Sequence, residues 1–235
     1  MRITLSAGLA LALIVPLAAA PAHARERAAW VKVDPDPVLI HGDRSTWITV
    51  SATIDDPNAV YDAITAEMRP VNEVGYNYAL LKDPDGDGVY TGRRKIDPFD
   101  VSPGKWRIEI VAIAADGSGE VQGPKGFFSI KGATRLSAKA APQKVRKGGA
   151  FVFSGRLTGV ETFDGGWTPY PKMPVKIYFQ RAGTAEWVYA AQVKTNSEGR
   201  FTKSFRPKKS GSWKAVYAGS AKYLASSKTV RVTLR

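Results

Sequence analysis

The feature of this sequence that most constrains its fold is a set of short runs in which apolar and polar residues alternate one by one. In residues 45–54, for example, Ile48, Val50 and Ala52 alternate with Thr49 and Ser51. A period of two places neighbouring side chains on opposite faces of a β-strand. Similar runs occupy residues 106–112, 175–180 and 230–234. The sequence therefore predicts a series of half-buried strands.

No amphipathic helix separates these runs, which are punctuated by Gly, Pro, Asp and Asn. This pattern is typical of an all-β sandwich. Residues 58–68 mix Ala, Glu and aromatic residues and admit a helical turn, but we expect mostly strand there. The chain contains no Cys, so disulfides, thiol chemistry and Cys-ligated zinc are excluded. Each domain must then be large enough to bury a core without disulfides.

The first 24 residues have the three parts of a secretory signal peptide: a positively charged start, an apolar centre and an Ala-x-Ala cleavage site that ends at Ala24. A membrane-spanning helix needs about 20 apolar residues. The apolar run here is shorter and is interrupted by Gly8 and Pro16. We therefore expect cleavage after Ala24 and export to the medium or the wall space, with no membrane span in the remaining chain.

Charge divides the expected mature chain into two parts. Residues 25–130 hold 12 Lys and Arg against 17 Asp and Glu, a net charge of −5, whereas residues 131–235 hold 21 against 4, a net charge of +17. Residues 127–130 resemble a closing strand, Lys131 and Gly132 a short linker, and residues 134–136 an opening strand. We predict an acidic domain over 25–130 and a basic domain over 131–235, each about 100 residues long.

The two parts share a local pattern. Residues 87–91 and 198–202 each combine an acidic residue, a Gly and an aromatic residue, and Trp106 and Trp213 each follow a Gly by two positions. Gly supplies the backbone conformation of a tight turn, and the Trp is expected to fill the core between two sheets.

These segments, residues 85–91 and 211–219 together with Tyr223, resemble the immunoglobulin-like or fibronectin-type-III-like domains of secreted bacterial proteins, particularly those of actinobacteria. The resemblance implies two β-sandwich domains in tandem and a role in adhesion, spacing or binding. It brings no catalytic residues and does not identify a ligand.

Residues 83–88 match the first half of a calcium loop, with Asp83, Asp85 and Asp87 as oxygen ligands. The position where such a loop carries a bidentate Glu is occupied by Arg94. A plain hairpin turn is favoured because the second domain makes the corresponding turn at residues 196–199 without an Asp cluster. A weak calcium site, completed by loop carboxylates such as those of Asp97 and Asp100, is the alternative.

Two clusters of positive charge stand out in the basic domain. They comprise Lys144, Arg146 and Lys147 in the first, and Arg206, Lys208 and Lys209 in the second. Solubility alone accounts for many charged surfaces, but a net charge of +17 also favours a polyanionic partner. We expect an anionic polysaccharide or cell-wall polymer, without specific recognition of nucleic acid. A protein partner is also open.

Aromatic residues are dense in the second domain, and most are expected in its core. The exceptions are Trp167 and Tyr170, in a long aromatic loop over residues 161–170 that either binds a ligand or covers a strand. A secreted protease inhibitor that presents this loop is a further, less favoured hypothesis.

Nothing in the sequence predicts an enzyme. His23 lies in the expected signal peptide, His41 stands alone beside a turn, and no Ser lies in a Gly-x-Ser-x-Gly motif. We expect a non-enzymatic binding or structural protein, with no cofactor unless calcium binds.

Overall fold

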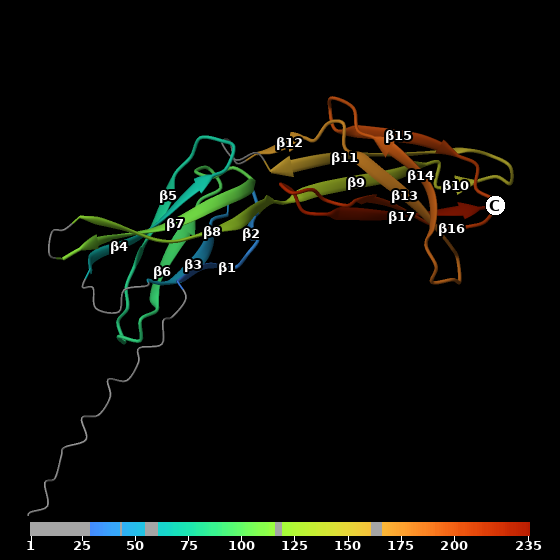
Figure 1. Cartoon of the computed structure of the whole chain (residues 1–235). Helices are drawn as coiled ribbons and strands as arrows, with labels where there is room; N and C mark the ends of the chain where they lie inside the picture. The colour runs from blue at the N-terminus through green and yellow to red at the C-terminus, as the bar shows by residue number, and fades with distance from the viewer. Residues whose placement is uncertain (1–28, 43, 55–60, 116–118, 161–165) are drawn as a thin grey trace, which may run out of the picture.

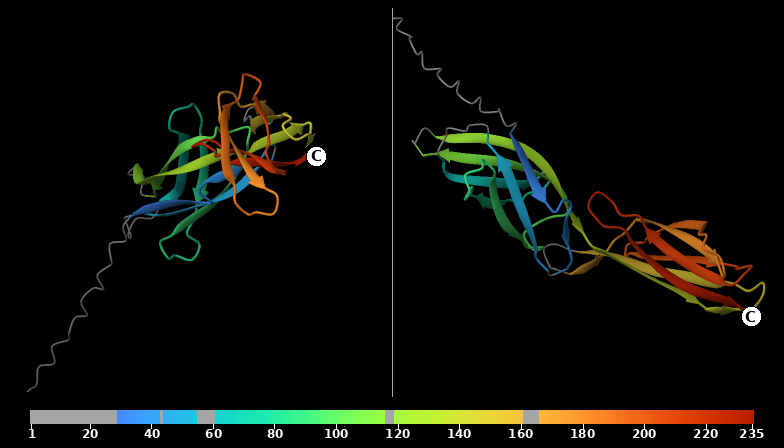
Figure 2. Two further views of the ribbon diagram at one scale, coloured as in Figure 1. Left: turned by 90° about the vertical axis from the view of Figure 1, so that its right-hand side faces the viewer. Right: turned by 90° about the horizontal axis from the view of Figure 1, so that it is seen from below.

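The computed structural model describes residues 29–42, 44–54, 61–115, 119–160 and 166–235. The predicted signal peptide, residues 1–24, lies outside this range. All regular elements of the described chain are strands, and they form two β-sandwiches that lie end to end, as the different views agree (Figures 1 and 2). The prediction of an all-β fold with two sandwiches in tandem is confirmed.

The first sandwich consists of a three-stranded and a five-stranded sheet. The three-stranded sheet has the order β1 (Trp30–Asp34), β3 (Thr46–Thr53), β6 (Tyr90–Ile96). The five-stranded sheet has the order β2 (Val38–Ile40), β8 (Glu120–Gly132), β7 (Gly104–Ala114), β4 (Tyr61–Pro70), β5 (Asn77–Leu81). The ambiguous stretch near residue 60 is therefore strand from Tyr61 onward.

The second sandwich repeats this arrangement. In one sheet β11 (Phe151–Val160) pairs with β9 (Thr134–Ala141), β12 (Trp167–Pro169) and β15 (Arg200–Phe205). The other has the order β10 (Lys144–Val145), β17 (Ser226–Leu234), β16 (Gly211–Tyr217), β13 (Pro174–Arg181), β14 (Val188–Lys194).

The strand order in both sandwiches is immunoglobulin-like. In each, the chain enters in one sheet and then crosses to the other, where a short strand runs parallel to the last strand: β2 beside β8, and β10 beside β17. All other pairs between strands are antiparallel, and the two inner faces enclose one core.

The two predicted tryptophans occupy equivalent places, because β7 and β16 are the corresponding strands of the two sandwiches. Trp106 is 1% exposed and Trp213 is 5% exposed. Trp106 packs against Phe128, while Trp213 lies among Phe151, Phe179 and Phe205, with ring centroids 4.5–5.0 Å apart. The faint sequence repeat therefore marks the same core position twice.

The junction between the sandwiches is hydrogen-bonded on both sides. Lys131 and Gly132, expected as a linker, are the last residues of β8, and only Ala133 separates them from β9. Gly132 exchanges backbone hydrogen bonds with the β16–β17 loop at Lys222 and Leu224, and the Ala133 N–H donates to the Ile40 carbonyl. The β16–β17 loop of the second sandwich is thus hydrogen-bonded to the last strand of the first sandwich.

Candidate functional site

Both basic clusters of the sequence lie at the end of the second sandwich that is farthest from the junction, hereafter the far end. β9 runs away from the junction and leads to β10, so Lys144 follows at that end. β11 starts there, and its first residue, Phe151, pairs with Phe205, the last residue of β15. The turn after β15 carries Arg206, so antiparallel pairing brings together segments some 60 residues apart.

Hydrogen bonds hold the turns of the far end together. Ser210, in the turn after β15, accepts from the backbone N–H of Leu234 through its Oγ at 2.8 Å and from that of Ala182 through its carbonyl at 3.0 Å. The Lys147 N–H donates to the Arg235 carbonyl at 3.3 Å. The turns that carry the cations are therefore fixed to a common backbone frame.

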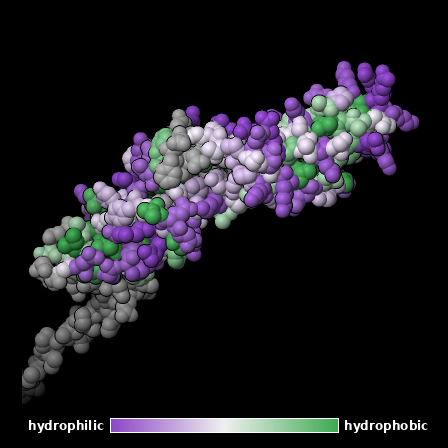
Figure 3. Space-filling model, turned by 90° about the horizontal axis from the view of Figure 1, so that it is seen from above, coloured by the Kyte–Doolittle hydropathy of each residue, from purple (hydrophilic) through white to green (hydrophobic). Residues whose placement is uncertain are grey.

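The positive side chains at the far end are all exposed. They are the six predicted residues, Lys144, Arg146, Lys147, Arg206, Lys208 and Lys209, joined by Arg181 and Arg235. None of the eight forms an ion pair within the described part of the chain. Many hydrophilic side chains project from this end of the molecule in Figure 3. The far end is thus a cluster of eight positive side chains, with the acidic residue Glu186 nearby in the turn between β13 and β14.

Sequence reasoning missed Arg181 and Arg235. Arg181 is the last residue of β13, and Arg235 follows the last residue of β17. To place both residues at the same end, one has to know the direction in which each strand runs. That direction depends on which strands pair.

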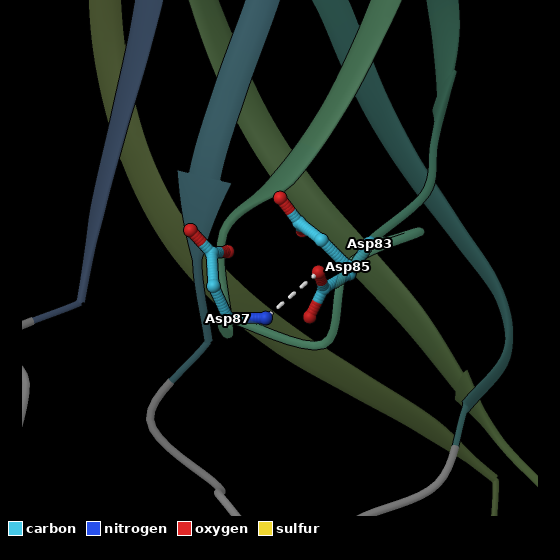
Figure 4. Close-up of side chains that lie close together, drawn as sticks. All are labelled: Asp83, Asp85 and Asp87. Atoms are coloured by element: carbon cyan, nitrogen blue, oxygen red, sulfur yellow. Dashed lines mark hydrogen bonds between the residues drawn. The ribbon is translucent and has the colours of Figure 1, made fainter.

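The three aspartates of the calcium hypothesis lie together in the turn between β5 and β6 (Figure 4). Each offers a carboxylate oxygen, and these oxygens lie within 4.8 Å of one another. The carboxylate of Asp83 accepts backbone hydrogen bonds from Gly86 and Gly88, both at 2.9 Å, and from Asp87 at 3.2 Å. Desolvation works against its ionisation, but these hydrogen bonds prevail and lower the pKa of Asp83.

The corresponding turn of the second sandwich is built in the same way around an uncharged acceptor. The Oδ1 of Asn196 accepts from the N–H groups of Glu198 at 3.1 Å and Arg200 at 2.8 Å. Gly88 and Gly199 have φ values of +82° and +72°, a conformation that favours glycine. Asp83 and Asn196 therefore share a turn-forming role, which accounts for Asp83 without a metal ion.

Asp97 and Asp100 cannot complete a site with Asp83. β6 separates Asp97 from the β5–β6 turn, so the two loops lie at opposite ends of the first sandwich. Asp97 instead accepts hydrogen bonds from Ser45 and from the N–H of Phe99.

Of the two readings left open for the aromatic loop of the second domain, the placement of Trp167 and Tyr170 fits the one in which the loop covers a strand. Residues 161–165 lie outside the described residues, but Trp167 belongs to β12, which pairs with β11. The centroid of its ring lies 3.6 Å from Cζ of the Arg135 guanidinium, beside the junction. Tyr170 is half-buried against Tyr217 and Tyr223, so it stabilises the junction side of the core rather than forming an exposed binding loop. Most other aromatic residues of the second domain were expected in the core, but Tyr189 is 57% exposed.

The described part of the chain contains no helix of the length and apolarity needed to cross a membrane.

No family model matches the chain, and no curated protein matches it. Among solved structures, the D0-D1 domain of intimin is 16% identical, with a TM-score of 0.31 over 86% of this chain and 97% of that chain. The amphioxus IgVJ-C2 molecule is 10% identical, with a TM-score of 0.36 over 83% and 99%. A DUF4785 family protein from Legionella pneumophila is 12% identical, with a TM-score of 0.40 over 86% and 55%. At such low identities and TM-scores, no function is transferred from these proteins.

Proposed function

We propose that this chain is an exported, non-enzymatic binding protein that attaches to an anionic extracellular or cell-wall polymer through the far end of its second sandwich. The observation that carries the proposal is the convergence on one end of eight exposed cations that form no ion pair among the described residues. Neutralising such a cluster with a polyanion releases counterions and relieves self-repulsion, and both effects favour binding.

The charge of the first sandwich and its position relative to the second support this assignment. The first sandwich is acidic by sequence, so it is repelled by a polyanion that attracts the second. The hydrogen-bonded junction holds the two apart along one axis, which would keep the first sandwich away from a bound surface. The first sandwich then acts as a spacer or as a carrier of another contact.

The test uses the full chain without residues 1–24 on immobilised heparin and on immobilised inorganic polyphosphate. Substituting Gln for Arg206, Lys208 and Lys209 is expected to lower the salt concentration of elution. It should also reduce the slope of log K against log salt by about one for each phosphate group that is no longer neutralised. A matched control replaces Lys172, Lys176 and Lys228, which lie toward the junction. Equally weakened retention of both variants would refute a site at the far end.

Export is tested separately, in cells that produce the full chain. Protein collected from the medium or wall fraction should begin at Arg25. Protein that stays inside the cells with residues 1–24 attached would contradict this part of the proposal.

A further inference from the structure

The second sandwich has an open groove of about 830 Å³ on the outer face of the sheet formed by β9, β11 and β15, distinct from the far end. Four of its lining residues are cations, Lys139, Arg156, Lys194 and Arg200, and none is an acid. The volume falls in the range of about 300–1,000 Å³ that is usual for ligand sites. The four cations come from four different strands, and none belongs to a basic cluster of the sequence.

Strand register arranges the polar residues of the groove in two rows. Arg156 pairs with Arg200 on one side and with Ser137 on the other. In the next row, Ser154 pairs with Thr202 and with Lys139. Directly opposed residues have Cβ atoms about 4.5–5.5 Å apart, and rows two residues apart along a strand are about 7 Å apart. Each of the three strands therefore contributes one cation and one hydroxyl group to a small, continuous area.

The opposition of Arg156 and Arg200 is unfavourable in the absence of a ligand, because like charges directly opposite each other destabilise a sheet. Glu198 offsets this only in part. Its carboxylate lies 3.0 Å from Arg200 Nε, with both side chains about two-thirds exposed, and its backbone carbonyl accepts from Arg156 Nε at 3.0 Å. Of the four cations, Arg200 alone forms an ion pair within the described part of the chain, and both guanidinium groups use Nε in these contacts, which leaves their terminal N–H groups available.

The floor of the groove is the close-packed backbone of the sheet. Ala138, Gly155 and Phe201 line it, and Phe201, which is 3% exposed, turns its ring to the core on the inner side. A Cβ on Gly155 would lie 2.6 Å from the Phe201 ring, so this ring occupies the space of a side chain at position 155. The hydroxyl groups of Ser154 and Thr202 make no hydrogen bond within the described part of the chain, and both stand beside the cations above this floor.

We propose that this groove binds a short segment of a chain that carries tetrahedral oxyanions, that is, phosphate or sulfate groups. Guanidinium groups recognise such groups through two parallel hydrogen bonds, and the Ser154 and Thr202 hydroxyls are additional donors. A bound oxyanion between Arg156 and Arg200 converts their repulsion into two attractive interactions. The site is independent of the far end, so the chain would bind a long polyanion at two places.

The test measures the binding of short probes to the full chain without residues 1–24 by calorimetry. Inorganic tripolyphosphate and a heparin-derived tetrasaccharide distinguish phosphate from sulfate groups, and an uncharged dextran oligosaccharide controls for the sugar. Replacing Arg156 and Arg200 by Gln should weaken the preferred charged probe by at least about tenfold, because both guanidinium groups that hydrogen-bond the oxyanion are removed. The dextran should not bind.

Two control variants make the result specific. Lys176→Gln with Lys228→Gln removes the same charge elsewhere, and the triple far-end variant removes more charge at the other site. Each should change the affinity for the short probe by less than about threefold, because solvent and salt screen distant charges. Equal weakening in all three variants, or no binding of either charged probe to the wild type, would overturn the groove. The two proposals can fail separately. If the far-end variant alone loses retention on long heparin and the groove variant binds the short probes like the controls, the groove proposal fails and the proposed function stands.

Stability provides a second readout. Arg156→Gln with Arg200→Gln should melt at the same temperature as the wild type or higher when no ligand is present, since the like-charge opposition is removed. The single variant Arg200→Gln serves if the double variant does not fold. A clear fall in melting temperature for this single variant would indicate that the arginines stabilise the sheet, and would overturn the ligand interpretation.

Discussion

The ammonium group of Lys222, in the loop between β16 and β17, donates a 2.5 Å hydrogen bond to the carboxylate of Glu73, in the turn between β4 and β5. It joins the two sandwiches beside the backbone hydrogen bonds of Gly132. Together with a hydrogen bond from Ser102, it lowers the pKa of Glu73 below the ordinary value of 4.5.

This pair predicts a pH-dependent junction. Because the folded pKa of Glu73 is lowered, its contribution is complete above about pH 4.5 and is lost as the pH falls through the folded pKa. The pair is partly exposed, so Glu73→Gln should cost no more than about 1 kcal/mol. Melting curves against pH measure the effect, and small-angle scattering follows the relative orientation of the sandwiches. Glu186→Gln is the control, and an identical pH response in both variants would contradict the prediction.

We expect the ring of Tyr223 to stabilise the junction side of the second sandwich more than the pair of Lys222 and Glu73 does. It packs on Tyr170 at 4.6 Å between centroids, and a Cβ on Gly132 or Gly159 would lie within 3.0 Å of it. Tyr223→Ala should destabilise the second sandwich by about 1–3 kcal/mol, because it removes a ring that fills the space beside both glycines. Urea denaturation measures the destabilisation. Tyr223→Phe keeps the ring and should retain most of the stability; a destabilisation as large as that of the Ala variant would refute the packing explanation.

The equivalent tryptophans should respond differently to the loss of the indole N–H. Trp106 Nε1 donates to the Ser102 carbonyl at 2.9 Å, whereas Trp213 Nε1 is buried without a partner among the described residues. Trp106→Phe removes a hydrogen bond that Trp213→Phe does not, so it should cost about 1 kcal/mol more free energy of unfolding. Urea denaturation of the two variants checks this, and equal costs would show that the hydrogen bond contributes nothing measurable.

The Asp83 turn predicts a graded response to substitution. Asp83→Ala removes the carboxylate that accepts from three backbone N–H groups and should lower the melting temperature of the first sandwich. Asp83→Asn keeps one oxygen, as Asn196 does in the second sandwich, and should have a smaller effect. Asp100→Ala, in the loop after β6, is the control. We expect no rise in melting temperature on adding calcium; a rise that Asp85→Asn and Asp87→Asn abolish would show that the turn binds the ion.

Much of the fold follows from the sequence, because strand formation is visible in neighbouring residues. The alternation around Ile48 and Val50 corresponds to β3, and the runs near Trp106, Val175 and Val230 correspond to β7, β13 and β17. The recurrence of the Gly and Trp pattern indicated two similar units. Each of these signals is local, since the period of two depends only on the geometry of an extended chain.

The sequence by itself therefore determined the strands, the two-sandwich architecture and the excess of positive charge after residue 131. Only the tertiary structure decided where that charge lies. Pairing of β11 with β15 and of β10 with β17 gathered Lys144 and Arg206 at the far end, and the same register opposed Arg156 to Arg200. The tertiary structure also packed the half-buried Tyr170 against the core and separated Asp97 from Asp83. These placements depend on interactions between residues far apart in the chain, which the period of a single strand does not encode.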